Sequence, residues 1–201
     1  MPVLNSAPSP ESFTDIFSKL LAERIIYLAG PIEDALATVI TAQLLYLESQ
    51  SSSKPIHLYI NSPGGSISSG LAIYDTIQYI KSPVSTVCLG QACSMASLLL
   101  CSGKRGKRLI LPNSMIMIHQ PSGGFKGQAS DIEIHANHIL NTKKKICSIY
   151  MKHMKEGLNS DKISELLERD RFLNAQEAVD LGLADKVLVT RQANDVIDNQ
   201  T

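Results

Sequence analysis

The fold is decided by the stretch VSTVCLGQACSMASLLL at residues 84–100. Its first part, residues 84–89, is an apolar run that predicts a buried strand. The small residues after Gly90 lead into a second apolar run, which predicts a helix. Ser94 stands between the two elements, at the expected N-terminus of the helix. Backbone N–H groups and the positive end of the helix dipole meet at such a position, so it favours a developing negative charge.

Two other polar residues have contexts that suit partners of Ser94. His119 follows the apolar run at residues 115–118 and precedes a Gln-Pro pair, which ends a strand and begins a loop. Asp170 lies at the end of a helical stretch. Taken singly, a serine is usually a helix cap, a histidine a structural residue and an aspartate a surface charge. Taken together, the three residue types are those of a serine hydrolase triad.

Cys93 is a rival nucleophile because it adjoins Ser94. Neighbouring residues at a strand-to-helix turn point in different directions, so only one of the two side chains can face His119. The four cysteines, at positions 88, 93, 101 and 147, lack Cys-x-x-Cys spacing, which indicates buried thiols in a reducing compartment. His135 and His138 share one face of an expected helix, but no third ligand accompanies them, so no metal site is predicted.

A glycine pair supplies a fourth element. The residues NSPGGS at 61–66 follow an expected strand, and two consecutive glycines let the chain turn tightly and bring N–H groups close to a bound group. With this element the sequence resembles the proteolytic subunit of the Clp protease (ClpP), a family of serine peptidases that work with an ATPase. The resemblance runs from about residue 13 to about residue 189. It rests on six blocks in the same order: YINSPGG at 59–65, GQACSM at 90–95, LPNS at 111–114, MIHQP at 117–121, GQASDI at 127–132 and ERDRF at 168–172.

The resemblance implies an α/β fold of the crotonase-like type, a spiral of β-β-α units with a protruding handle helix. It further implies an axial N-terminal segment at residues 1–18, one protease domain at residues 19–201, and a handle at about residues 123–155. The hydrophobic pattern agrees with this organisation. Strands are expected at 25–29, 56–60, 84–89, 107–111 and 115–118, and helices at 33–48, 68–80, 94–102, 129–155 and 160–168.

The resemblance also implies a role for each residue of the site. Ser94 is expected to attack the peptide carbonyl, His119 to act as general base and then acid, and Asp170 to orient the imidazole. The backbone N–H groups of Gly65 and Met95 match the oxyanion hole of the family.

Assembly and partners follow from the same resemblance. Two stacked seven-membered rings of identical subunits are expected, and Arg169, Gln128 and Asp131 match residues that hold the rings together. Unfolded polypeptides would be fed by an AAA+ unfoldase of the ClpX type. The chain has no Gly-x-x-x-x-Gly-Lys-Ser/Thr motif, so ATP is expected on the partner and no cofactor on this chain. The positions that match the apolar docking cleft of the family are His57, Tyr59, Tyr79, Leu89, Leu109, Leu111 and Leu188.

Composition limits the other possibilities. At 201 residues and 44% hydrophobic content, one domain with a proper core is expected. The 19 basic and 19 acidic residues cancel, so neither nucleic acid nor a membrane is an expected partner. The motif variants look most like the mitochondrial and α-proteobacterial branch. This predicts the mitochondrial matrix, with a presequence absent from this sequence, and the bacterial cytoplasm as the alternative.

Two other functions fit part of the pattern. A crotonase-type acyl-CoA enzyme shares the fold and an oxyanion hole after a glycine pair, but it uses carboxylates and needs no Ser/His/Asp set. A catalytically silent ring subunit would lack triad residues, and all three are present here. Three features depart from the family: Ala96 stands where glycine is usual, His57 stands where an aromatic residue is common in the docking surface, and residues 5–12 lack the Arg-Gly-Glu-Arg run of the axial segment.

Overall fold

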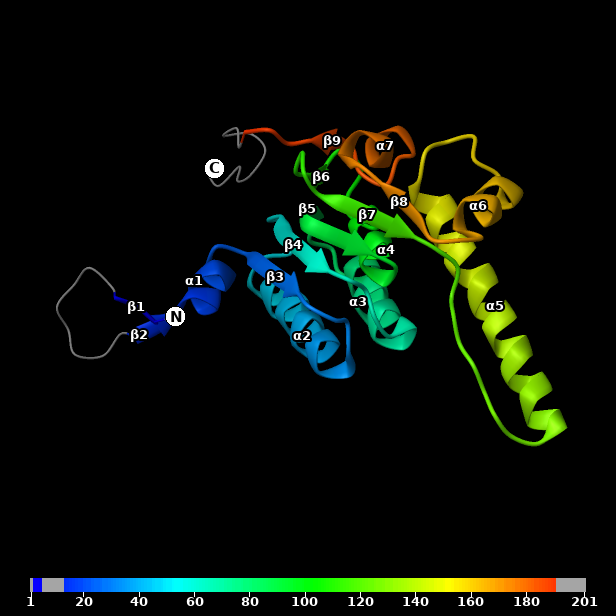
Figure 1. Cartoon of the computed structure of the whole chain (residues 1–201). Helices are drawn as coiled ribbons and strands as arrows, with labels where there is room; N and C mark the ends of the chain where they lie inside the picture. The colour runs from blue at the N-terminus through cyan, green and yellow to red at the C-terminus, as the bar shows by residue number, and fades with distance from the viewer. Residues whose placement is uncertain (1, 5–12, 191–201) are drawn as a thin grey trace.

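The structure, a computed structural model, describes residues 2–4 and 13–190 (Figure 1). A seven-stranded sheet forms its centre. Five strands follow one another in the sheet in the order β3, β4, β5, β6 and β9, and every pair among them is parallel. Their bounds are β3 Ile25–Ala29, β4 Ile56–Ser62, β5 Val84–Cys93, β6 Arg108–Ile110 and β9 Lys186–Val187.

Strand β5 is longer than the sequence predicts, because it continues past Gly90 to Cys93. Its first half pairs with β6, and its last three residues pair with β7 (Met115–Ile118). An irregularity beside β4 falls between these halves, at the left-handed Gly90 (φ 70°). The small residues after Gly90 are held in the sheet by β7, and the helix that follows begins at Met95, one residue from its expected start at residue 94.

The strand β8 (Arg171–Leu173) was not expected from the sequence, and it pairs with β7 in the antiparallel direction. Only three residues long and half exposed, β8 carries too short a pattern to be recognised. This strand joins the segment containing Asp170 to the centre of the molecule.

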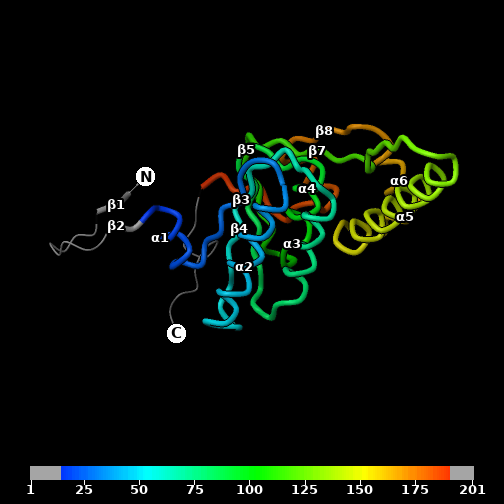
Figure 2. The backbone as a smooth tube through the Cα atoms, turned by 90° about the horizontal axis from the view of Figure 1, so that it is seen from below, coloured from blue at the N-terminus to red at the C-terminus, as the bar shows by residue number. Residues whose placement is uncertain are grey.

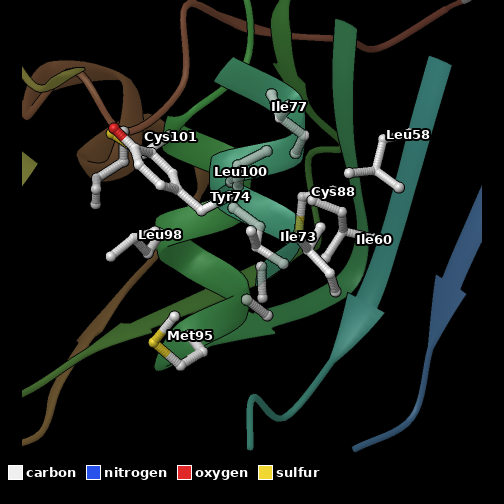
Figure 3. Close-up of a cluster of buried hydrophobic side chains, with 14 of the residues drawn as sticks. Leu58, Ile60, Ile73, Tyr74, Ile77, Cys88, Met95, Leu98, Leu100 and Cys101 are labelled. Atoms are coloured by element: carbon white, nitrogen blue, oxygen red, sulfur yellow. The ribbon is translucent and has the colours of Figure 1, made fainter. Parts of the chain in front are cut away.

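Three helices cover one face of the sheet: α2 (Asp34–Gln50), α3 (Ile67–Tyr79) and α4 (Met95–Cys101). Their ends lie within two residues of the predicted ends. Apolar side chains from α3 and α4 meet those of β4 and β5 in a dry layer between helices and sheet (Figure 3). Helix α4 is buried along its whole length, which explains why its sequence lacks a polar face.

The handle helix α5 (Ala129–His153) projects away from the sheet (Figures 1 and 2). Its C-terminal part is anchored by Ile146, Cys147, Tyr150 and His153, which are buried, whereas its N-terminal half is exposed. Residues 125–128, which lead into this helix, form no strand.

Two further helices, α6 (Ser160–Leu167) and α7 (Ala175–Asp180), return the chain to the sheet. The side chain of Asn159 caps α6 by accepting from the Lys162 N–H at 2.9 Å. A capping box between Asn174 and Glu177 begins α7, where the two residues exchange backbone and side-chain hydrogen bonds.

The N-terminal strands β1 (Pro2–Leu4) and β2 (Phe13–Asp15) form an antiparallel pair that leads into α1 (Ile16–Ala22). The expected boundary after residue 18 falls inside this helix. Residues 5–12, where the sequence departs from the family, lie outside the described residues.

A buried arginine ties the C-terminal part of the chain to the core. The guanidinium of Arg108 pairs with the Asp185 carboxylate and donates to the carbonyls of Cys101, His153 and Gly182 at 3.2, 2.7 and 2.9 Å. These partners belong to the end of α4, the end of α5 and the turn before β9. Burial acts to raise the pKa of Asp185, but hydrogen bonds from Arg108 outweigh it and lower that pKa.

We expect Asp185→Asn to lower the free energy of unfolding by about 3 kcal/mol, because it leaves the buried Arg108 charge without its counter-ion. Glu156→Gln, which breaks the exposed pair with Arg105, is the control and should change little. Urea unfolding at one protein concentration measures both variants.

The pH dependence of the same experiment gives a second readout. The folded pKa of Asp185 lies below its ordinary value of 3.8, so its contribution is complete above that pH and is lost as the pH falls through the lower folded value. The difference between the wild type and Asp185→Asn should therefore shrink in strong acid. A constant difference down to that range would contradict this assignment.

Candidate active site

The register of three strands brings Ser94, His119 and Asp170 to one place. Ser94 directly follows β5, and its N–H donates to the carbonyl of Met117 in β7 at 2.8 Å. His119 directly follows β7, and Asp170 directly precedes β8. Because Ile118 of β7 pairs with Arg171 of β8, the histidine and the aspartate emerge side by side.

The three side chains form one chain of hydrogen bonds. His119 Nε2 lies 2.9 Å from Ser94 Oγ, and His119 Nδ1 lies 2.9 Å from Asp170 Oδ1. If Nδ1–H donates to the carboxylate, Nε2 is left as an acceptor for the serine hydroxyl. The imidazole is then placed to remove the hydroxyl proton while the carboxylate stabilises the charge that it gains. Asp170 is exposed in the isolated chain, with 62% of its side chain accessible.

The backbone of Ser94 is in an unusual conformation, with φ 55° and ψ −122°. Positive φ is costly for a residue with a Cβ atom, of the order of 1–3 kcal/mol, and such residues occur where a turn must present a side chain. Here the turn separates β5 from α4, and it directs the hydroxyl towards His119. The Gly-x-Ser-x-Gly motif that marks such a strained turn in other hydrolases does not surround Ser94, so the sequence did not predict this backbone conformation.

The glycine pair packs directly against the Ser94 turn. A Cβ atom on Gly64 would come within 2.5 Å of the Cys93 carbonyl oxygen and 2.8 Å of the Ser94 Cβ. The Gly64 backbone also has φ 90°, a conformation that glycine adopts without penalty. Only glycine therefore allows the loop and the turn to approach so closely.

Gly65 is held by Ile32 on its other side. The Ile32 N–H donates to the Gly64 carbonyl, and the Ile32 carbonyl accepts from the Ser66 N–H, both at 2.8 Å. These bonds involve the Gly64 carbonyl and the Ser66 N–H, but not the N–H of Gly65. Because successive backbone groups in an extended segment point to opposite sides, the Gly65 N–H points away from Ile32. Gly65 and Met95 line the same cleft as the Ser94 and His119 side chains.

Cys93 does not share this position. Its thiol is buried and lies 3.5 Å from the side-chain oxygen of Gln91, and burial raises its pKa. The other three cysteines are also buried, and burial raises the pKa of Cys88 and of Cys101 to about 12. High pKa values keep these thiols protonated and unreactive, which supports the choice of Ser94 over Cys93.

Gln120 was not singled out from the sequence, yet it links the segment after β7 to the end of α6, just before Asp170. Its N–H donates to the Leu167 carbonyl at 2.6 Å, and its side-chain amide donates to the Glu168 carbonyl at 2.8 Å. The Glu168 carboxylate in turn pairs with Lys143 of the handle helix at 3.0 Å. No sequence motif marks such contacts, since they depend on how distant segments meet.

The predicted assembly residues Gln128, Asp131 and Arg169 are all exposed. Most predicted docking residues come together in a small apolar cluster, separate from the main core. We call it the docking cluster: Val87, Leu109 and Leu188 are buried in it, with Tyr59, Leu89 and Leu111 packed against them. His57 and Tyr79 are not part of this cluster, for His57 is buried at 4% exposure and Tyr79 is 80% exposed at the end of α3.

The two handle histidines are not brought to a common ligand. The ring of His135 stacks on Phe125 with centroids 3.7 Å apart. Among the described residues, no three His, Cys, Asp or Glu side chains gather as a metal site would require. No helix in the described ranges is both long and apolar enough to cross a membrane.

A family model described as Clp protease matches residues 8–191. The chain belongs to the Clp protease family. The match includes every element of the site, and it agrees with the resemblance carried by the sequence blocks. The chain is therefore the proteolytic subunit of a Clp protease, and the family works as an oligomeric barrel with an AAA+ partner. The match favours this function over the alternative of a crotonase-type acyl-CoA enzyme.

The approach of Gly64 to Ser94 can be tested with a matched pair of variants. Gly64→Ala should lower peptide cleavage by roughly 100-fold or more, because the added methyl group must displace the Ser94 turn. Gly30→Ala is the control, since Gly30 also has positive φ (80°) but open space around it. Assembly of both variants is checked by light scattering. Equal activity in the two would show that this contact does not position Ser94.

Proposed function

We propose that this Clp protease subunit is a serine-type endopeptidase in which Ser94 is the nucleophile. The observation that carries the proposal is the continuous hydrogen-bonded chain from Ser94 through His119 to Asp170. Ser94 Oγ attacks the scissile carbonyl while His119 Nε2 takes its proton. The imidazolium then protonates the leaving amine, and water completes hydrolysis of the acyl-enzyme by the same route.

We further propose that the N–H groups of Gly65 and Met95 stabilise the oxyanion. Both residues line the cleft beside Ser94, and Met95 is the first residue of helix α4, where backbone N–H groups lack partners within the helix. In another serine protease, loss of one such donor costs about 10²–10³ in rate. Backbone placement at these two residues should thus matter nearly as much as the triad.

An apolar groove extends this cleft. It is lined by Gly65, Ile67, Leu71, Pro121 and Ile139, among others, and runs between the glycine loop and the handle helix. An extended, unfolded polypeptide suits such an open groove better than a folded domain does. This agrees with substrates that arrive already unfolded.

For the assembly, we propose two stacked seven-membered rings of crotonase-like subunits. Arg169 adjoins Asp170, so contacts made there would bear directly on the triad, whereas Gln128 and Asp131 begin the projecting end of the handle helix. The exposed apolar residues Ile132, Ile134 and Leu140 leave the handle in need of a partner surface. Covering this region would also shield the exposed Asp170 from water.

For the partner, we propose an AAA+ unfoldase of the ClpX type, which binds and hydrolyses the ATP. The docking cluster supports this, because Tyr59, Leu89 and Leu111 remain partly accessible above buried leucines. We propose that the exposed Tyr79 also contacts the unfoldase, whereas the buried His57 would act only by supporting its neighbours. The mitochondrial branch and the matrix location stay predictions.

Ser94→Ala should abolish both peptide cleavage and labelling by a fluorophosphonate probe, while the protein stays folded. Cys93→Ala is the neighbouring control and should keep most of the activity, because its thiol is buried and makes no hydrogen bond to His119. Wild-type turnover in Ser94→Ala would overturn the mechanism. An inert wild-type protein would instead favour a catalytically silent ring subunit.

Tyr59→Ala should abolish degradation of a tagged folded protein in the presence of the unfoldase but leave cleavage of short peptides intact. An aromatic anchor in an interface often contributes about 2 kcal/mol, enough to weaken docking roughly 30-fold. Tyr46→Ala, at an exposed tyrosine on α2 outside the docking cluster, is the control. Loss of both activities in Tyr59→Ala would point to a folding role, and loss of neither would place docking elsewhere.

A further inference from the structure

Two hydroxyl groups that the triad does not use lie buried beneath the Ser94 turn. Ser97 Oγ lies 2.6 Å from the Ser94 carbonyl oxygen and 2.7 Å from Tyr150 Oη. Tyr150 Oη itself lies 3.4 Å from the same carbonyl. Ser97 is 0% and Tyr150 2% exposed, and we call them the hydroxyl pair.

The hydrogen atoms of the hydroxyl pair can be counted. Each hydroxyl carries one hydrogen, and the Ser94 carbonyl can only accept. If Ser97 donates to the carbonyl, the hydrogen between Ser97 and Tyr150 must come from Tyr150. Burial raises the pKa of Tyr150, so its phenol stays protonated and remains a donor. The Tyr150 hydrogen then points to Ser97 Oγ and the Ser97 hydrogen points to the Ser94 carbonyl, so the two hydroxyls form a relay that ends on this carbonyl.

The Ser94 carbonyl belongs to the same planar peptide unit as the Met95 N–H. In a trans peptide these two groups point in opposite directions, and no cis bond occurs among the described residues. A force that holds the carbonyl inward therefore turns the N–H outward, towards the cleft that Met95 lines. Backbone N–H groups of Ser97 and Leu98 also reach the carbonyl, at 3.0 and 3.4 Å.

This peptide unit needs such support because it follows a residue in a strained conformation. Ser94 has φ 55° and ψ −122°, and ψ is the angle that sets the direction of the following peptide. A small rotation would relieve the strain and swing the Met95 N–H away from its target.

We propose that the hydroxyl pair positions the Met95 N–H as an oxyanion donor by holding the Ser94 carbonyl. The inference rests on the proposed serine mechanism. Ser97 acts from α4 and Tyr150 from α5, so the oxyanion hole is braced by the handle helix. Neither residue touches the reacting atoms, and both are positioning residues.

The test uses Tyr150→Phe and Ser97→Ala, which remove the hydroxyls and keep the surrounding packing nearly unchanged. We expect kcat for a short peptide to fall about fivefold in each variant, equivalent to ~1 kcal/mol, with KM unchanged. Affinity for a peptide boronate, which forms a tetrahedral adduct on the serine, should fall by the same factor. The double variant should be little worse than either single one, because both hydroxyls act on one carbonyl.

Tyr74→Phe is the matched control. It also removes a buried tyrosine hydroxyl bonded to the handle helix, since Tyr74 Oη lies 3.0 Å from His153 Nε2, but this bond does not involve the Ser94 carbonyl. We expect it to keep the wild-type kcat and boronate affinity, even if its thermal midpoint falls.

Several outcomes would overturn the inference: unchanged kcat in both single variants, a lower kcat without weaker boronate binding, or losses that add in the double variant. If light scattering shows that Tyr150→Phe does not assemble, the kcat and boronate affinity of Ser97→Ala alone decide whether the inference holds. Failure of the proposed function looks different, because wild-type protein would then bind no boronate and Ser94→Ala would keep its turnover.

Discussion

The whole site depends on hydrogen bonds that strand β7 makes along both of its edges. On one edge β7 holds the end of β5 and the N–H of Ser94, and on the other it holds β8. His119 follows β7 directly, so it stands between the serine and the aspartate at 2.9 Å from each. A slip of one residue in either pairing would turn one of the three proposed catalytic side chains to the opposite face of the sheet. Gln120 strengthens the second edge by bonding the backbone of residues 167 and 168.

The same arrangement concentrates backbone strain at Ser94, and the surrounding contacts hold that strain in place. Gly64 closes on the turn from one side, where no other residue would fit. The hydroxyl pair holds the carbonyl of Ser94 from below. A residue with positive φ survives only where its neighbours leave it no alternative, and these contacts meet that condition. The geometry at Ser94 therefore depends on three segments far apart in the chain: the glycine loop, the Ser94 turn with the start of α4, and the end of α5.

The handle helix has two ends with different tasks. Its buried end supplies Tyr150 to the hydroxyl pair and the His153 carbonyl to Arg108, so it is fastened to both the site and the core. Its exposed end carries apolar side chains and leaves the body of the subunit (Figure 1). If the hydroxyl pair acts as proposed, a shift at the free end of this anchored helix would reach the Ser94 carbonyl. For a family that works as a barrel, this gives a physical route by which contacts between subunits reach the site.

The sequence alone predicted the main strands and helices between residues 25 and 168, and it singled out Ser94, His119, Asp170 and the glycine pair as candidate site residues. These features are local, because hydrophobic periodicity and turn residues report on one element at a time. The length of β5, the antiparallel β8, the left-handed Ser94 and the contacts of Gln120 and Tyr150 were decided only by the tertiary structure. Each of them depends on which distant segment pairs with which, and at what register. A periodic pattern shows that a residue is buried, but it carries no information on the group that the residue meets there.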